Sequence, residues 1–586
     1  MDSTFGTYPE PNRPTIMGTH HVVAAGHYMS AQAGFQVLEA GGNAVDAGVA
    51  AGIATGVLEG GYTNIGGVAP IILHMAETGK TVTISGLGTW PKKATCKYFQ
   101  KNHGGKIPQG LHRTVIPAAP DAWITALARY GTMSFSDVAS HSIRIAREGF
   151  PMYARMYNLL EVSVEGYRSK PSSAAIFLRD GKPPPVGSLF VQSDLSKTLQ
   201  YMADQEKAHA KGDRKRGLKA ARDAFYKGDI ARTIADYHAK NDGLVTMEDM
   251  AGFRVGIEPP VMARFGDWEI YGCGPWCQGP MLMQIMNLMD GNDLKRMGLN
   301  SADYVHTVTE AIKLAAADRE AYYGDPRFVD VPIAELLSDA YSRERRKLID
   351  PAKACPEMPR AGAVKGGRWP EPERYVQAPS ASPVPIEKDE GTFDTSYLCA
   401  IDKWGNAFSA TPSDGSRTSP VIPGLGFVPS SRGSQSRVDP KHPSSVAPGK
   451  RPRLTPNPAL AIQRGKTVMP FGTPGGDVQV QAMAQAFINV AVFGMDPQNA
   501  IEQPRFASYS FPSSFAPNEY RPGQLNLEGR FDRSIGDELS RRGHKIEWWP
   551  DKVWMAGSLC VIRRDVKTGV LQGGADPRRT AYAIGW

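Results

Sequence analysis

A threonine that follows a proline-rich stretch and opens a hairpin constrains this chain more than any other feature. The junction reads Asp394-Thr395-Ser396, and residues 397–407 predict two short strands joined by a turn at 403–406. If the bond before Thr395 is cut, a free α-amine lies beside the threonine hydroxyl. That amine has an unperturbed pKa of about 8 and can act as the base for the hydroxyl, so one residue supplies both nucleophile and base.

Length and composition favour a soluble protein with a large core. The 586 residues predict two to four domains or one large two-layer unit. With 41% hydrophobic and 22% charged residues, the composition is typical of soluble proteins. The net charge of +8 is diffuse, and only Lys207–Lys219 is strongly basic. That run lacks the interleaved aromatic residues of single-strand binders, so we interpret it as a solvated loop or helix face and expect no nucleic-acid partner.

Neither a secretory signal nor a membrane span is expected. Residues 1–17 are polar and proline-rich, unlike a signal peptide. The most apolar stretch, Ala44–Leu58, contains Asp46 and several glycines, so we expect no membrane partner. The six cysteines are scattered, as in a reducing compartment, and we expect a cytoplasmic protein.

Metal and cofactor sites are not expected either. The twelve histidines include His20-His21 and His27, which share a segment without an acidic partner at ligand spacing. No glycine-rich run ends in Lys-Ser or Lys-Thr before a helix, as a phosphate-binding loop would. We therefore expect neither a metal site nor a bound cofactor.

Hydrophobic periodicity predicts helices that cover a sheet, followed by a helical lobe. Residues 29–39 and 44–58 carry small and apolar residues at helical spacing and are separated by Gly41-Gly42, with Asn43 as the cap of the second helix. Between about residues 118 and 350 the pattern is mostly helical. Further strands are predicted at 70–74, 82–85, 559–562 and 581–585, and further helices at 134–148, 220–240, 302–323 and 479–493.

The stretch before the junction is rich in proline. Residues 351–390 contain eight prolines and little periodicity, so we interpret them as a mobile surface segment. A long loop without structure is normally functional or a linker. Its position directly before Thr395 favours a function.

Seven short motifs in a fixed order make the chain resemble the γ-glutamyltranspeptidases, a branch of the N-terminal nucleophile hydrolases. The motifs are Ala31–Asp46, Asn64–Gly67, Tyr226–Ala231, Asp402–Ala407, Gly449–Pro452, Thr473–Gly476 and Gly574–Arg578. Any one of them occurs by chance. Together, and in this order, they run nearly from end to end and make the resemblance specific.

The resemblance implies an α/β (α+β) fold, namely a four-layer αββα sandwich with a mostly helical lobe in the large subunit. It also implies a precursor that cleaves itself between Asp394 and Thr395. The products would be a large subunit, 1–394, in which 350–394 is the mobile segment before the cleavage site, and a small catalytic subunit, 395–586. The two subunits would associate, and a dimer of such heterodimers is a further option.

The family chemistry can be carried over by position. The Thr395 hydroxyl would attack the Asp394 carbonyl, form an ester that water opens, and later attack an amide substrate. Gly475 and Gly476 resemble the pair whose amides form the oxyanion hole, and Ser413 stands where the family has a second threonine that hydrogen-bonds the nucleophile. The alternatives are a strand threonine paired across the sheet, a tight turn at the two glycines and a surface serine.

The departures from the family concern the substrate. Family enzymes hold the carboxylate of a γ-glutamyl donor with an arginine, and this chain has Leu87 at that point. Gln435 stands in place of the amine-binding aspartate, and Leu454 and Thr455 in place of a serine pair. A zwitterion would leave two charges unpaired in such a pocket, so we expect an acyl group that is not γ-glutamyl.

Two kinds of acyl group remain. A neutral or apolar group fits Leu87, Trp90 and Leu454. Arg432 or Arg417 could instead recognise a carboxylate from another side, although we expect both to be surface arginines.

Three functions are compatible with these residues. The favoured one is an autoprocessing N-terminal threonine amidohydrolase or acylase that hydrolyses a small amide, with water as final acceptor. The second is a γ-glutamyltransferase or glutathione hydrolase with a rearranged pocket. The third is a non-catalytic relative that is never cleaved and serves as a binding scaffold.

Overall fold

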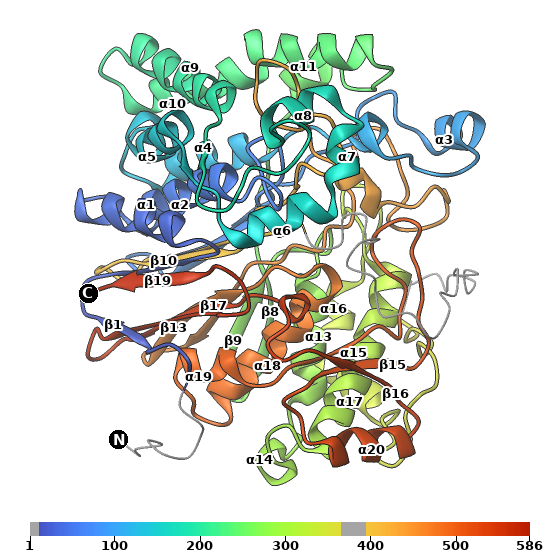
Figure 1. The fold of residues 1–586 in the computed structure, drawn as a ribbon. Helices are drawn as coiled ribbons and strands as arrows, with labels where there is room; N and C mark the ends of the chain where they lie inside the picture. Colours follow the sequence, from blue (N-terminus) through green and yellow to red (C-terminus); the bar gives the residue numbers. More distant parts are fainter. Residues whose placement is uncertain (1–10, 365–393) are drawn as a thin grey trace.

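The computed structural model describes residues 11–364 and 394–586 and has two seven-stranded antiparallel sheets packed face to face (Figure 1). The upper sheet consists, in order, of β19 (Tyr582–Gly585), β2 (Val22–Ala25), β10 (Leu398–Ile401), β11 (Ala407–Ala410), β3 (Ile71–Met75), β4 (Lys80–Ile84) and β7 (Ile257–Glu258). The lower sheet consists of β1 (Ile16–Gly18), β18 (Leu571–Ala575), β17 (Cys560–Asp565), β13 (Thr467–Gly472), β12 (Ala459–Gln463), β9 (Trp268–Gly272) and β8 (Val261–Phe265).

Both faces of β10 are buried, which explains its unbroken apolar sequence. Successive side chains of a strand point to opposite faces. Cys399 and Ile401 therefore pack between the two sheets, against lower-sheet residues such as Ile562. Leu398 and Ala400 instead pack against the helices above.

Helices cover the outer face of each sheet, so the expected four-layer αββα sandwich is confirmed. Above lie α1 (Tyr28–Glu39), α2 (Ala44–Leu58), α4 (Ala119–Tyr130) and α5 (Phe135–Glu148). Below lie α13 (Gly279–Met289), α15 (Ala302–Tyr322) and α18 (Gln479–Ala491). The small residues of α2 have a direct cause, because a Cβ added to Gly48 would be 2.1 Å from the ring of Phe408 in β11.

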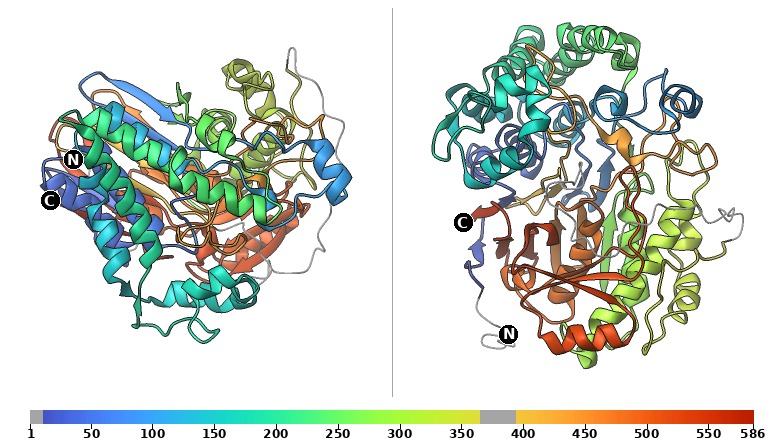
Figure 2. Two further views of the ribbon diagram at one scale, coloured as in Figure 1. Left: turned by 90° about the horizontal axis from the view of Figure 1, so that it is seen from above. Right: turned by 45° about the vertical axis from the view of Figure 1, so that its right-hand side comes forward.

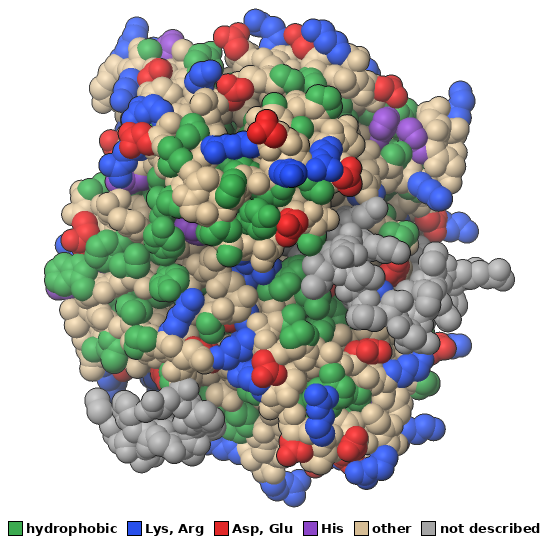
Figure 3. Space-filling view, viewed as in Figure 1, with side chains coloured by type: hydrophobic (Ala, Val, Ile, Leu, Met, Phe, Trp, Pro, Cys, Tyr) green, Lys and Arg blue, Asp and Glu red, His purple; other side chains and the backbone are tan. Residues whose placement is uncertain are grey.

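The predicted helical lobe is confirmed as well. It comprises α6 (Ala154–Val162), α7 (Val164–Arg168), α8 (Pro171–Phe177), α9 (Ser193–Ala210), α10 (Arg214–Tyr226), α11 (Asp229–Lys240) and α12 (Met247–Gly252). Figure 2 shows helices of this lobe running over the upper helical layer. The basic run 207–219 spans the end of α9 and the start of α10, where Asp213 caps the second helix. Charges of both signs are interspersed on the face shown in Figure 3.

Three sequence predictions differ from the structure. The helix predicted at 220–240 is broken at Lys227-Gly228 into α10 and α11. The region predicted to be mostly helical also contains β7, β8 and β9. Strands β8 and β9 form a short hairpin at Gly266 that carries little periodicity. The sequence does not predict strand β18, because its adjacent glycines 573 and 574 resemble a turn. Both are needed for packing, since a Cβ on Gly573 would be 2.7 Å from Val22 and a Cβ on Gly574 would be 2.8 Å from Pro497.

The proline-rich segment is partly anchored. Residues 365–393, which hold most of the predicted mobile stretch, lie outside the described residues. Before them, the Gly362 amide donates to Asp318 at 2.8 Å, and its carbonyl accepts from Tyr322 at 2.6 Å. These bonds anchor Gly362 on α15, and the mobility of the segment as a whole stays a prediction. Over the described parts of the chain, the helices all lack the length and apolar character needed to cross a bilayer.

Candidate active site

Thr395 and Ser413 lie directly opposite each other in the central hairpin of the upper sheet. The register of β10 and β11 pairs Leu398 with Ala410, and the same register extended by three residues pairs Thr395 with Ser413. The two hydroxyl oxygens are 2.7 Å apart. Both residues are buried, which rules out the alternative of a surface serine at 413.

The carbonyl oxygen of Asp394, which precedes Thr395, accepts two hydrogen bonds. Ser413 Oγ donates to it at 2.5 Å, and Arg432 Nη2 donates to it at 2.8 Å. The same guanidinium nitrogen donates to Ser413 Oγ at 2.5 Å. Donors placed in this way stabilise the negative charge that develops on a carbonyl oxygen under nucleophilic attack.

These contacts fix the direction of the threonine hydroxyl. A serine hydroxyl has one proton and two lone pairs. Ser413 gives its proton to the Asp394 carbonyl, and one lone pair accepts from Arg432. The remaining lone pair can only accept, so the proton of Thr395 points at Ser413 and the lone pairs of Thr395 Oγ1 stay free for attack.

Arg432 is not the surface arginine that the sequence predicted. Its side chain is 1% exposed and lies between two carboxylates, with Nη2 at 2.6 Å from Asp394 and Nε at 3.2 Å from Asp414. Arg417, the other expected surface arginine, is half-buried. Burial raises the pKa of the Asp394 carboxyl, an effect that Arg432 opposes and Asp414 reinforces.

Asp414 fixes Arg432 in place. Its backbone φ is +90°, a conformation that a residue other than glycine rarely adopts. Ser431 holds the carboxylate with its amide at 3.0 Å and its hydroxyl at 2.9 Å, and the Ser430 hydroxyl donates to it at 2.6 Å. Such local strain is typical of functional sites.

Gly475 and Gly476 lie at the end of β13 that faces the start of β10. Their φ values are +136° and +55°, which favour glycine. Gly472, the last residue of β13, lies so close to Tyr397 that a Cβ would be 2.3 Å from its ring. The glycine loop is thus at the same end of the sandwich as Thr395. Its role as oxyanion donor stays a prediction.

The residues expected around the acyl group form two pairs. Leu87 and Leu454 share a buried apolar cluster with Val68 and Trp276. Because the amide of Ser413 donates to the Val68 carbonyl at 3.0 Å, this cluster borders the nucleophile pair.

The second pair is polar, since Gln435 Nε2 donates to Thr455 Oγ1 at 2.8 Å. Trp90 packs against Phe99 in another apolar cluster and donates to Ser436. A Cβ on Gly433, next to Arg432, would be 2.3 Å from its ring, and its role beside the acyl group stays a prediction.

A buried ionic network holds the loops that carry these residues. Glu320 of α15 lies 2.6 Å from Arg453, which precedes Leu454, and 2.9 Å from Arg437 and Arg319. Burial alone would raise the pKa of Glu320, but the three arginines outweigh it and the pKa is lowered well below its usual value.

The sequence missed a cationic group on the other side of the nucleophile. Arg579 Nη1 donates to the backbone carbonyl of Thr395 at 3.2 Å. Arg579 and Arg155 both approach the rings of Tyr62 and Trp554. Arg579 directly follows the motif at 574–578 and could have been noticed from it, whereas Arg155 in α6 carries no such signal.

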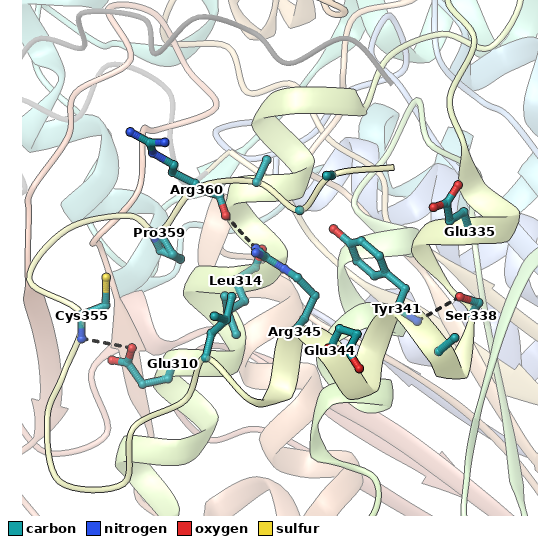
Figure 4. Close-up of a pocket in the computed structure, with 15 residues that line it drawn as sticks. Glu310, Leu314, Glu335, Ser338, Tyr341, Glu344, Arg345, Cys355, Pro359 and Arg360 are labelled. Carbon is teal, nitrogen blue, oxygen red and sulfur yellow. Dashed lines mark hydrogen bonds between the residues drawn. The ribbon is translucent and has the colours of Figure 1, made fainter. Parts of the chain in front are cut away.

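A cavity of about 860 Å³ lies away from Thr395, between α15, α17 (Asp339–Arg346) and residues 355–363 (Figure 4). Arg345 reaches across it to the carbonyl of Arg360 at 2.9 Å. The described lining residues all fall within 310–363 and include none of the residues around Thr395.

Near this cavity, His306, Glu310 and His544 offer ligand atoms within 4.8 Å of one another. Lys313 Nζ lies 2.5 Å from Glu310, so an ammonium already balances the carboxylate. The group is explained without a cation, and the expectation of no metal site stays a prediction.

Comparison with known proteins identifies the family. The family model described as Gamma-glutamyltranspeptidase matches residues 30–586. The chain belongs to this family. The acylases among its relatives are hydrolytic enzymes with an N-terminal nucleophile. This chain is an enzyme of the same kind.

Its relatives include both acylases and glutathione hydrolases. The Acylase ACY 1 proenzyme of Pseudomonas sp. (strain SE83) is 30% identical over 571 residues, 95% of this chain and 92% of that protein. The Glutathione hydrolase-like YwrD proenzyme of Bacillus subtilis (strain 168) is 29% identical over 575 residues, 97% of this chain and 99% of that protein. The crystal structure of a cephalosporin acylase from Bacillus halodurans matches with a TM-score of 0.84 at 27% identity, covering 100% of this chain and 99% of that chain.

Proposed function

We propose that the chain is a precursor that cleaves itself between Asp394 and Thr395 and then hydrolyses a small amide through an acyl-enzyme on Thr395. One observation carries the proposal. Thr395 Oγ1 is oriented by Ser413, and the adjacent carbonyl oxygen is held by Ser413 and Arg432. Its relatives are described as proenzymes, which supports a maturation cleavage.

The cleavage can be written so that its atoms balance. Thr395 Oγ1 bonds to the carbonyl carbon of Asp394, its proton passes to Ser413, and the Ser413 proton passes to the carbonyl oxygen. Collapse of this centre breaks the C–N bond, the proton moves to the Thr395 nitrogen, and an ester remains. Water hydrolyses the ester and leaves a carboxylate on Asp394 and a free amine on Thr395, which then serves as the base for amide substrates.

The two products, 1–394 and 395–586, would stay associated because each sheet contains strands of both. In the upper sheet, β10 and β11 of the small subunit lie between β2 and β3 of the large one. In the lower sheet, β12 of the small subunit pairs with β9 of the large one. Separation would break these backbone ladders and expose the core between the sheets.

The acyl group of the substrate is proposed to be other than γ-glutamyl, with water as final acceptor. Leu87 and Leu454 form an apolar wall next to Ser413, at two of the positions where family enzymes hold the carboxylate of a γ-glutamyl donor with an arginine and a serine pair. The acylases among the relatives support this choice. The similarity to the Glutathione hydrolase-like YwrD proenzyme supports the alternative, a glutathione hydrolase.

Mass spectrometry of the acylated enzyme tests the proposal. Purified protein is mixed with pentanoyl anilide and, separately, with γ-glutamyl anilide, then quenched with acid and digested. We expect a pentanoyl adduct on the peptide that begins at Thr395, and faster turnover of the pentanoyl substrate. An adduct on another residue would contradict the nucleophile, and faster turnover of the γ-glutamyl substrate would favour the glutathione hydrolase.

A further inference from the structure

We infer that Arg155 and Arg579 form a carboxylate-binding subsite beside Thr395, framed by the rings of Tyr62 and Trp554. The inference rests on the proposed function, because it names a group that the amide substrate must carry. It concerns the side of the site where Arg579 contacts the Thr395 carbonyl, away from Leu87 and Leu454.

The two guanidinium groups share the same pair of aromatic rings. Arg579 Cζ lies 5.3 Å from the centroid of each ring. Arg155 Cζ lies 5.4 Å from the Tyr62 ring and 4.6 Å from the Trp554 ring. Cations at such distances from ring faces are held by the ring quadrupole, which fixes position but accepts no hydrogen bond in the plane of the guanidinium.

Several donors of this pair are left without an acceptor. Arg579 is 7% exposed, and only its Nη1 is used, in the bond to the Thr395 carbonyl. Its Nε and Nη2, and the Nε of Arg155, are buried and have no hydrogen-bond partner among the described residues. Buried donors are almost always paired in native structures, so unpaired donors on two adjacent arginines indicate a place for a ligand.

The local charge also favours an anion. The nearby acid, Glu59, accepts from Ser396 at 2.5 Å, and its charge acts on both arginines, but among the described residues no carboxylate forms a close ion pair with either arginine. Burial, and after it the charge of Arg155, lowers the pKa of Arg579 to about 10, although Tyr62, Glu59 and Asp576 oppose the shift. An anion between the two guanidinium groups would accept from the unpaired donors and would offset the repulsion between the two cations.

A carboxylate suits this geometry. It is planar, it can accept from two guanidinium N–H groups at once, and it fits between aromatic walls. The subsite also has a route to solvent, because Arg155 and Trp554 are half-buried while Tyr62 and Arg579 are buried. In Figure 1, α6, which carries Arg155, crosses the front of the molecule where the helical half meets the sheets.

The carboxylate can belong to either half of the amide, and three substrates separate the two sources. Pentanoyl anilide is neutral, glutaryl anilide carries a carboxylate on the acyl half, and pentanoyl 4-aminobenzoate carries one on the amine half. We expect one of the two charged substrates to exceed the neutral one in kcat/KM by at least about tenfold, as one charge-assisted hydrogen bond would give.

The variant Arg155→Gln should bring that ratio to about one, mainly through KM. Arg155 is chosen because it is half-buried and because the hydrogen bond to the Thr395 carbonyl comes from Arg579 instead. Arg147→Gln, at an exposed position of α5, is the matched control and should leave the ratio unchanged. Equal kcat/KM for all three substrates in the wild type, or an unchanged ratio in Arg155→Gln, would overturn the inference.

Calorimetry keeps this test separate from the proposed function. Glutarate and 4-acetamidobenzoate are titrated into wild type and Arg155→Gln, beside their uncharged amides. The inference predicts that one of the two acids binds to the wild type and that Arg155→Gln no longer binds it, whether or not the enzyme hydrolyses amides. Absence of chain cleavage and of amide hydrolysis would defeat the proposed function, whereas absence of acid binding would defeat the subsite.

Discussion

Ser413 lies opposite Thr395, with 2.7 Å between their hydroxyl oxygens, because the hairpin register of β10 and β11 continues past both strands. The turn at 402–406 sets that register, and Asn406 supports it by donating to Asp402 at 2.8 Å. The relation between nucleophile and helper is therefore a property of the hairpin. It also places the proton of Ser413 on the carbonyl that Thr395 must attack.

Removing the Ser413 hydroxyl should slow chain cleavage. In Ser413→Ala the Asp394 carbonyl loses one of its two donors, and Thr395 loses the acceptor that orients it. Loss of one oxyanion donor typically costs about 10²–10³ in rate. The conversion of intact chain to two fragments is followed on denaturing gels. Ser413→Thr keeps the hydroxyl and should cleave within about tenfold of wild type, and equal rates for all three proteins would contradict this role.

Replacing Arg432 should harm both stability and cleavage. Arg432→Gln leaves the buried carboxylates of Asp394 and Asp414 facing each other without a cation. Breaking a buried pair in this way costs about 3–5 kcal/mol, measurable by urea unfolding. The double variant Arg432→Gln/Asp414→Asn removes one of those charges and should recover part of the loss. A single variant as stable as wild type would show that the cation is not needed.

Two glycines of α2 should respond in opposite ways to alanine. Gly48→Ala would place a methyl group 2.1 Å from the Phe408 ring, so the helix must shift away from the sheet. Overpacking of this kind costs about 1–3 kcal/mol. At Gly56 the nearest atom is 3.5 Å away, and alanine gains helix propensity, so stability should be unchanged or rise by up to about 1 kcal/mol. Thermal unfolding compares them, and equal effects would contradict the packing described for α2.

Stability should fall in acid through Glu320. Its pKa in the folded state is lowered below the unfolded value of about 4.3, so its contribution is fully present above that value and is lost as pH falls below it. Glu320→Gln should cost about 3–5 kcal/mol at pH 7, because three arginines lose their shared acceptor, and should flatten the decline below pH 4.3. Glu344→Gln, at an exposed pair with Lys347, is the control and should stay within about 0.5 kcal/mol. If the stability of Glu320→Gln falls as steeply below pH 4.3 as that of wild type, the acid sensitivity belongs to other groups.

Local patterns predicted much of the fold. The bounds of α2 agree with the structure, and those of α1 and α15 lie within one residue of the prediction. Elements with weak local signals were missed: β8 and β9 are short, and β18 contains glycines that tertiary contacts require. The four-layer arrangement came from the family resemblance, because periodicity does not say which sheet a strand joins.

The residues of the candidate site also differ in how far the sequence could predict them. Thr395, Ser413, Leu87 and Leu454 were predicted from their positions relative to the family pattern, and the structure brings them close together, while their roles stay predictions. Arg432 was expected at the surface, since sequence alone cannot show that Asp394 and Asp414 would be buried around it. Arg155 and Trp554 come from distant segments that meet only in the folded protein, so neither had a local pattern to mark it.

Intact-mass measurement with N-terminal sequencing tests the central claim most directly. Freshly purified wild-type protein should give two polypeptides, and the smaller should begin Thr395-Ser396-Tyr397. Thr395→Ala should give a single polypeptide of full length. An active wild-type preparation that remains one intact chain, or a small fragment that begins at another residue, would contradict the claim that Thr395 becomes the N-terminal nucleophile.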